Sequence, residues 1–366
     1  MKSSLIVLTL LASMPWSVFA FTNRKLLEIS DSGHPELTKS VAAIVPKYLQ
    51  VSSMFSWMNR NPENILFKSA AKATYKRLLP NNLCEAEKSK IGLTHFEQNE
   101  FAVCTAFLIG EDTLATAGHC FFAQDGTNVK AKRKKCDNYQ LVFNFTKESY
   151  STSKSADKSN GLEYQQISVK KDDLYTCSEV VGNFSYSEDW AIIKLKKPVV
   201  DKVILKLNTE YKYTRGEEIY SAGYPLGTAL KVSEAGFLNR TNFLETEMYA
   251  TLLNQQGMSG APIFNMKNEV IGILTGSYSN EYLPFIEAST HKIDGKSVRI
   301  NQDQFYDLSG QCDRIPSCQP IMGQSKYKCN LDINGQSLAW DEVSTDGSLT
   351  IFHGIKSITN FESLFQ

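Results

Sequence analysis

The chain has 366 residues, and its 42 % hydrophobic and 21 % charged side chains are the composition of an ordinary globular protein with room for about two domains. Lys and Arg together number 39, as do Asp and Glu, so the formal net charge is zero. This balance excludes a whole-protein field that would attract nucleic acid or an anionic membrane, and partners must be inferred from local sites.

Residues 1–20 have the pattern of a secretory signal peptide. Lys2 precedes an apolar run from Leu5 to Leu11, and Val18-Phe19-Ala20 has the small residues of a cleavage site. A membrane anchor is disfavoured because this run is too short to cross about 30 Å of hydrocarbon, and no later stretch is long enough. The sequence therefore predicts an exported, soluble protein, secreted or periplasmic, without a membrane span.

Residues 21–83 are polar and mixed, with helix-like pieces over 35–44 and 67–79. They lack the repeated Val/Ile alternation that follows. Two interpretations stay open for this segment: a leader or pro-segment, or a helical arm packed on the main domain.

From residue 91 onward, short runs of β-forming residues alternate with turn residues, which is typical of an antiparallel sandwich or barrel. The predicted strands lie at 102–110, 113–117, 140–145, 166–169, 190–195, 218–222, 232–238, 261–264 and 270–275. The basic run 130–135 and the Ser/Lys/Asp-rich stretch 148–161 are predicted to be solvated loops. A nucleic-acid patch is disfavoured because the basic run has no interleaved aromatic residues.

Residues 311–366 hold three of the eight cysteines and two β-like pieces, at 336–340 and 348–353. We interpret this segment as a Cys-containing C-terminal extension. Cysteines in an exported chain are more often bridged than free, since that compartment is oxidising.

The stretch Gly257-Met258-Ser259-Gly260 carries the first chemical signal. A serine hydroxyl is a poor nucleophile near neutral pH, so an acyl-transfer enzyme must expose it on a turn, deprotonate it and stabilise the oxyanion that forms. The flanking glycines let the backbone bend sharply and leave amides open to a ligand. Alone the motif is weak, because Gly-x-Ser-Gly also occurs in ordinary turns.

A nucleophilic serine needs a base with a pKa near neutral, and histidine is the natural candidate. Of the five histidines, only His119 has a suggestive context, because it follows the apolar stretch Leu114–Gly118 and precedes Cys120. The other four lie in polar or turn-like surroundings.

The third member should be a carboxylate beside an apolar strand, where it orients the imidazole. Asp189 leads directly into the apolar run Trp190–Leu195 and fits best. Asp172 and Asp173 are the rivals, but the strand after them is poorer.

Three motifs in chain order carry a resemblance: Thr116-Ala117-Gly118-His119-Cys120, Asp189-Trp190-Ala191-Ile192 and Gly257-Met258-Ser259-Gly260-Ala261-Pro262. They resemble the chymotrypsin-fold (trypsin-like) serine peptidases, most strongly a bacterial branch that includes the glutamyl endopeptidases. That family uses the order His, Asp, Ser, whereas other folds with this triad use other orders. The resemblance covers about Cys84 to Thr275 and includes Gly223-Tyr224-Pro225-Leu226-Gly227.

The resemblance implies an all-β fold of two antiparallel six-stranded β-barrels, over about 84–202 and 203–310, with a partly helical N-terminal segment and the C-terminal extension. It implies that Cys104–Cys120 is bridged and that Cys136–Cys177 is the next bridge. Cys84, Cys312, Cys318 and Cys329 are left with three possible pairings.

By the same resemblance, Ser259 attacks the scissile carbonyl, His119 takes and returns the proton, and Asp189 holds the His119 tautomer. The backbone amides of Gly257 and Ser259 would form the oxyanion hole. The resemblance implies neither a metal nor a cofactor.

Two departures from the family pattern are informative. Met258 stands where trypsin-like zymogens carry an aspartate that pairs with a new amino terminus, so that activation switch is absent. An Arg/Lys-selective pocket would have an aspartate at Leu253, and a Glu-selective pocket of the bacterial type would have Gly-Ile-His where this chain has Gly272-Ile273-Leu274. The candidate pocket residues are Leu253, Asn254, Leu274, Thr275 and Gly276, and we expect cleavage after a neutral or apolar residue.

The sequence thus predicts a secreted serine endopeptidase that acts on protein or peptide substrates through an acyl-enzyme. The competing hypothesis is a non-enzymatic peptide- or protein-binding protein that kept the fold and lost turnover. An esterase with the same triad is disfavoured, because those enzymes usually follow another chain order.

Overall fold

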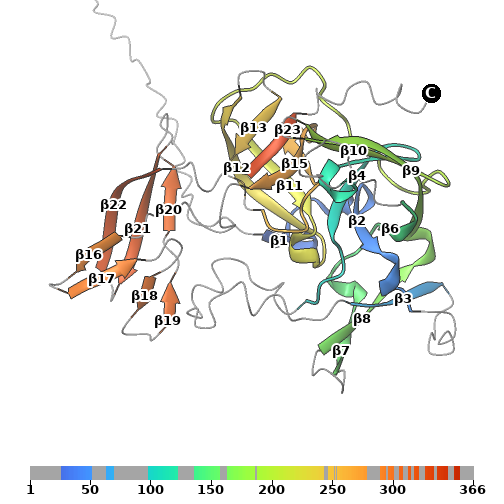
Figure 1. The fold of residues 1–366 in the computed structure, drawn as a ribbon, viewed down its shortest axis with the longest axis horizontal. Coiled ribbons are helices and arrows are strands. Elements are labelled where there is room, and N and C mark those ends of the chain that lie inside the picture. Colours follow the sequence, from blue (N-terminus) through green and yellow to red (C-terminus); the bar gives the residue numbers. More distant parts are fainter. Residues whose placement is uncertain are drawn as a thin grey trace, which may run out of the picture.

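The computed structural model describes residues 26–51, 63–69, 98–122, 136–156, 163–185, 188–242, 246–250, 252, 254–277 and 350–354, and a series of short strands between 289 and 344. Figure 1 shows that the described residues form β-strands and short 3-10 helices. No helix in this part of the chain has the length and apolar character needed to cross a bilayer. The predicted signal peptide and Cys84 lie outside the described residues.

Six antiparallel strands close into the first barrel, in the order β10-β5-β4-β2-β6-β9. They are β2 (Val41–Pro46), β4 (Cys104–Gly110), β5 (Thr113–Thr116), β6 (Tyr139–Val142), β9 (Leu174–Phe184) and β10 (Asp189–Leu195). Apolar side chains of these strands form one buried cluster. Closure removes the free edges that an open sheet would expose, so the barrel is a firm base for the loops at its ends.

A second ring of six strands forms because β12 pairs with β13 as well as with β11, within the order β1-β12-β11-β14-β15-β23-β13. Its strands are β11 (Glu218–Gly223), β12 (Lys231–Thr241), β13 (Glu247–Ala250), β14 (Pro262–Asn265), β15 (Val270–Ser277) and β23 (Thr350–Gly354), and β1 (Leu26–Glu28) adds to β12 from outside the ring. A second apolar cluster, which includes Ile219, Ile263 and Phe352, fills this barrel. The predicted all-β double barrel is confirmed.

The first barrel begins earlier in the chain than residue 84, where the sequence predicted its start. Val41–Pro46 is a strand of the first barrel, hydrogen-bonded between β4 and β6, and all six of its residues are buried. The helix expected over 35–44 is therefore wrong beyond the 3-10 turn Pro35–Lys39. The run Val-Ala-Ala-Ile-Val suits a strand covered on both faces, which shows no alternation of polar and apolar residues. A removable leader ending at residue 83 does not fit this barrel.

The C-terminal boundary also differs. β23 pairs with β13 and β15 and completes the second barrel, so residues 350–354 belong to the barrel rather than to an extension (Figure 1). The strands between 289 and 344 pair only among themselves, so the strands at 289–293 and 296–300 lie outside the second barrel, which the sequence predicts to extend to residue 310. They are β16 (Ser289–Ile293) with β17 (Lys296–Ile300), β18 (Phe305–Asp307) with β19 (Cys312–Arg314), and β20 (Ser317–Pro320), β21 (Lys326–Ile333) and β22 (Gln336–Ser344).

Backbone register bears on the open cysteine pairings. Cys318 on β20 lies directly opposite Cys329 on β21. Directly opposed residues of antiparallel strands have Cα separations of about 4.5–5.5 Å, which a disulfide can span. Among the three alternatives, this register favours the one that joins these two positions.

A small third sheet has the order β3-β8-β7. It consists of β3 (Asn64–Lys68), β8 (Glu163–Lys170) and β7 (Tyr150–Ala156), so the solvated loop expected over 148–161 is wrong for residues 150–156. Polar residues are tolerated there because β7 is an edge strand.

The 3-10 helices of the described residues are η1 (Ile29–Asp31), η2 (Pro35–Lys39), η3 (Lys47–Leu49), η6 (Gly118–Cys120), η7 (Cys136–Asn138), η8 (Lys147–Ser149), η9 (Lys171–Asp173) and η10 (Pro225–Gly227).

Candidate active site

His119 and Asp189 are joined by two hydrogen bonds. Strand β5 delivers His119 on the short helix η6, and Asp189 begins β10, the strand that pairs with β5. The backbone N–H of His119 donates to Asp189 Oδ1 at 2.8 Å, and Nδ1 lies 2.7 Å from Oδ2. The Asp189 side chain is 9 % exposed and that of His119 27 %, so the carboxylate is covered while the ring reaches solvent.

This close approach requires the glycine before His119. A Cβ at Gly118 would collide with the Asn183 carbonyl oxygen and would lie 3.0 Å from Asp189 Oδ1. The rival carboxylate Asp173 is engaged elsewhere, because its Oδ1 accepts a hydrogen bond from Lys202 Nζ at 2.8 Å. The structure therefore pairs the histidine with the carboxylate that the sequence favoured.

Ser259 lies on a loop that is attached to the first barrel through Thr105. The Thr105 N–H donates to Ser259 O at 2.8 Å, and its hydroxyl donates to Gly257 O at 2.9 Å. Gly260 has a φ of +87°, and a Cβ there would collide with Thr105 O and Thr116 Oγ1. The glycine after the serine is thus needed for both its backbone conformation and its close contact with the barrel.

The same contacts bring Ser259 beside the His119 helix. Cys104 and Cys120 form a disulfide, and Cys120 Sγ lies 3.8 Å from Ser259 O. Ser259 itself is partly exposed. Among the described residues its hydroxyl makes no hydrogen bond to His119, and such bonds are often long before substrate is bound. The predicted bridges Cys104–Cys120 and Cys136–Cys177 are both present.

The orientation of one peptide unit determines where the Gly257 amide points. Gln256 O accepts a hydrogen bond from the Leu226 N–H at 2.5 Å. A trans peptide directs its N–H opposite to its C=O, so the Gly257 N–H faces away from Leu226. Within the described part of the chain, neither this amide nor that of Ser259 has an acceptor. Two backbone donors are therefore available to a ligand next to Ser259.

Met258 is fully buried in the apolar cluster of the second barrel. Its Cγ would lie 3.3 Å from a Cβ placed at Gly223, which shows how tightly it packs there. Apolar packing thus anchors the residue that precedes Ser259, where a zymogen aspartate would need an ionic partner.

The candidate pocket residues follow the serine loop and the end of β15. Leu253 lies outside the described residues, and Asn254 is buried beside the loop. Leu274 is 2 % exposed, and its carbonyl accepts the Gly260 N–H at 2.7 Å, which ties β15 to the serine loop. Thr275 and Gly276 are partly exposed, and a Cβ at Gly276 would meet open space.

Two residues that contribute to the site have no recognisable signal in the sequence. Thr105 bonds both carbonyls that flank Met258, yet a threonine inside a strand carries no signal beyond β-propensity. Phe184 ends β9 with its ring 5.7 Å from that of His119, and only the β9–β10 register brings it there.

The ligand atoms of Cys104, His119 and Cys120 lie within 4.8 Å of one another, which is close enough to consider a metal. Both sulfurs are used in the disulfide, and a metal binds thiolate sulfur. This donor set does not fit a metal centre.

The two barrels, with His119 and Asp189 on the first and the Ser259 loop on the second, define the chymotrypsin-like class of fold. Residues 104–273 match the family model described as a trypsin-like peptidase domain, and this part of the chain is a peptidase domain of that family.

Two solved structures are similar to parts of the chain. Neuropsin, a serine protease expressed in the limbic system of mouse brain, matches with 11 % identity and a TM-score of 0.37, over 72 % of this chain and 89 % of its own. A Glu endopeptidase in complex with MPD matches with 17 % identity and a TM-score of 0.35, over 49 % of this chain and 75 % of its own.

Proposed function

We propose that this protein is a secreted serine endopeptidase with the triad His119, Asp189 and Ser259. The observation that carries the proposal is the double hydrogen bond from His119 to Asp189 beside the Ser259 loop. It engages Nδ1 and leaves Nε2 as the ring nitrogen that can accept a proton. The trypsin-like family match over 104–273 supports the reaction class.

The proposed reaction has two halves. His119 Nε2 takes the proton of Ser259 Oγ as the oxygen attacks the scissile carbonyl carbon, and Asp189 stabilises the imidazolium that forms. The amides of Gly257 and Ser259 hold the oxyanion. His119 then gives its proton to the leaving amine, and water releases the acyl group by the same steps in reverse order.

The proposed preference is a neutral or apolar residue before the scissile bond. Of the candidate pocket residues that the structure describes, Asn254, Leu274, Thr275 and Gly276, none carries a charge. A charged substrate side chain would enter such a pocket without a counter-charge, which is costly.

Export to an oxidising compartment is part of the proposal. Its support is the signal-like sequence over residues 1–20 and the two disulfides of the first barrel.

The test is Ser259→Ala in the exported protein, with hydrolysis of a mixed peptide library followed by mass spectrometry. We expect activity to fall by roughly 10⁴-fold or more while the thermal unfolding midpoint stays unchanged. An organofluorophosphonate should label Ser259 of the wild type with one-to-one stoichiometry.

Wild-type cleavage rates in the alanine variant would contradict the assignment. A folded wild type that neither reacts with the phosphonate nor cleaves the library would support the non-enzymatic binding protein instead.

A further inference from the structure

A buried ion pair lies outside the catalytic residues proposed above. Lys231 begins β12 with its side chain 0 % exposed, and its Nζ lies 3.0 Å from Glu28 Oε1 on β1. Gln98 joins the pair, since its Nε2 donates to Glu28 Oε1 at 2.9 Å and its Oε1 accepts from Lys231 Nζ at 3.1 Å. We call Glu28, Gln98 and Lys231 the buried cluster. Charges at this depth are weak evidence for stability, because well-packed apolar residues often stabilise a fold equally well.

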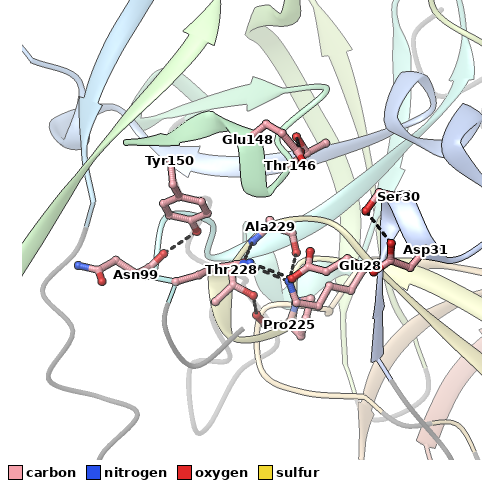
Figure 2. A network of polar contacts seen from close by, with 12 residues as sticks. Glu28, Ser30, Asp31, Asn99, Thr146, Glu148, Tyr150, Pro225, Thr228 and Ala229 are labelled. Atoms are coloured by element: carbon pink, nitrogen blue, oxygen red, sulfur yellow. Dashed lines mark hydrogen bonds and ion pairs between the residues drawn. The ribbon is translucent and has the colours of Figure 1, made fainter. Parts of the chain in front are cut away.

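The buried cluster makes polar contacts with the turn over residues 224–229. The Ala229 N–H donates to Gln98 Oε1 at 3.1 Å, and the Ala229 carbonyl oxygen lies 3.4 Å from Lys231 Nζ. Figure 2 shows Glu28 next to Ala229, with Thr228 and Pro225 of the same turn beside them. Pro225 O accepts bonds from both the hydroxyl and the amide of Thr228, at 2.7 and 2.9 Å, so the turn is internally braced.

The other end of this turn touches the oxyanion loop, residues 256–260. The Leu226 N–H bonds Gln256 O, which orients the peptide carrying the Gly257 amide. Gly257 has a φ of +93°, and a Cβ there would lie 2.5 Å from Tyr224 O and 2.7 Å from the Gly227 nitrogen. The turn is therefore in direct backbone contact with the loop that carries the proposed oxyanion donors.

Residues of the first barrel's core cluster also hold the turn. Gly227 O accepts the amides of Phe101 and Ala102 at 2.8 and 3.0 Å, and the Tyr224 hydroxyl donates to Val41 O at 3.0 Å. The buried cluster adds the N-terminal strand β1 to these anchors, since Glu28 lies on β1 and Lys231 on β12.

We propose that Glu28, Gln98 and Lys231 are positioning residues for the oxyanion hole, acting through the turn 224–229 on the Gln256–Gly257 peptide. The inference rests on the proposed function. In trypsin-like zymogens an aspartate at the position of Met258 pairs with a freed amino terminus and orders the oxyanion loop. Met258 cannot form such a pair, and in this proposal the internal ion pair of Glu28 and Lys231 orders the loop instead. Loss of the cluster should weaken transition-state stabilisation more than substrate binding.

The test compares Lys231→Met with Lys202→Met. Lys202 pairs with Asp173 at 2.8 Å with side-chain exposures of 4 % and 10 %, so the control also breaks a buried ion pair. The acylation rate constant and the half-saturation concentration are measured from the burst of p-nitrophenol released from p-nitrophenyl acetate, with thermal unfolding of each variant alongside.

For Lys231→Met we expect the acylation rate constant to fall by roughly 10- to 100-fold, below the 10²–10³-fold typical for complete loss of an oxyanion donor. The half-saturation concentration should change by less than about 3-fold. For Lys202→Met we expect a comparable loss of thermal stability with acylation within about 2-fold of wild type.

Equal acylation losses in the two variants, or an unchanged rate in folded Lys231→Met, would overturn the positioning role. Gln98→Ala keeps the ion pair and the contact of Lys231 Nζ with the Ala229 carbonyl but removes the hydrogen bond from the Ala229 N–H, and it is the variant to use if Lys231→Met does not fold. We expect it to lower acylation by about 3- to 10-fold, and no change would also overturn the proposal. A wild type that is neither acylated nor phosphonylated at Ser259 would instead refute the proposed function and, with it, this inference.

Discussion

Two segments outside the recognisable motifs differ in how they contribute to the two barrels. The N-terminal residues 26–46 pair with β12 of the second barrel and then supply a strand of the first, so they contribute strands to both barrels. After β15, the next strand that the chain adds to the second barrel is β23, with Ser277 directly opposite Thr350. The strands between these points pair only among themselves. Distance from a catalytic motif therefore does not tell whether a segment is part of a barrel.

The strongest test of this contrast is removal of residues 21–46. We expect no folded protein, because the deletion opens the first barrel and takes away a strand with six buried residues. Circular dichroism and urea titration should show no cooperative transition. A folded, active protein that lacks residues 21–46 would show that this part of the N-terminal segment is a removable leader after all.

A milder test is Ile44→Ala in the middle of β2, where the side chain is 0 % exposed. We expect the free energy of unfolding in urea to fall by about 2–5 kcal/mol, from lost burial and the cavity left behind. Met266→Ala is the matched control, since Met266 is 60 % exposed and should change stability by less than about 0.5 kcal/mol. Equal effects at the two sites would argue against a structural role for β2.

The pH dependence of stability tests the attachment of β1. Burial lowers the pKa of the Lys231 ammonium to about 8 from its usual 10.5, with the nearby Glu28 carboxylate opposing the shift. Between these values the unfolded chain binds more protons at this site than the folded chain, so its contribution to stability rises with pH. From pH 8 to 10.5, the free energy of unfolding of the wild type should therefore rise relative to that of Lys231→Met, by at most about 3 kcal/mol.

A difference between wild type and Lys231→Met that is flat across this range, or that falls with pH, would contradict the attachment. Lys202→Met supplies the baseline for other groups that titrate there.

The smallest loss of stability and activity is expected from replacing residues 278–349 by the two-residue turn Asn-Gly. Because Ser277 and Thr350 are register partners, a short hairpin turn can join β15 to β23 without moving either strand. Loop closure costs about 0.6 kcal/mol less for each halving of loop length, and shortening 72 residues to two is about five halvings, so the unfolding free energy should rise by at most about 3 kcal/mol. Hydrolysis of p-nitrophenyl acetate should persist, and an insoluble product would show that the segment is structurally required.

The strands and the candidate catalytic residues could largely be predicted because their signals are local. Each of the nine predicted strands overlaps an observed one, since β-forming runs bounded by turn residues can be recognised within a short window. His119 and Asp189 were both found at the ends of such strands, and the structure brings them into hydrogen-bond contact.

The elements that the sequence did not predict correctly depend instead on partners that are distant along the chain. Val41–Pro46 has no alternation because both faces of the strand are covered, so its burial depends on partners more than fifty residues away on β4 and β6. The sequence places residues 350–354 in the extension because β13 and β15, the partners of β23, are separated from it by a long insertion.

By itself the sequence determined the motif order His119, Asp189, Ser259, and its resemblance to the trypsin-like peptidases implied the two bridges of the first barrel and the lack of a zymogen aspartate at Met258. Only the tertiary structure decided that the N-terminal segment is part of both barrels and that Thr105 and the turn 224–229 hold the serine loop. The physical reason is sequence separation. Glu28 and Lys231 make a 3.0 Å contact across 203 positions of the chain, and no local pattern of residues encodes such a pair.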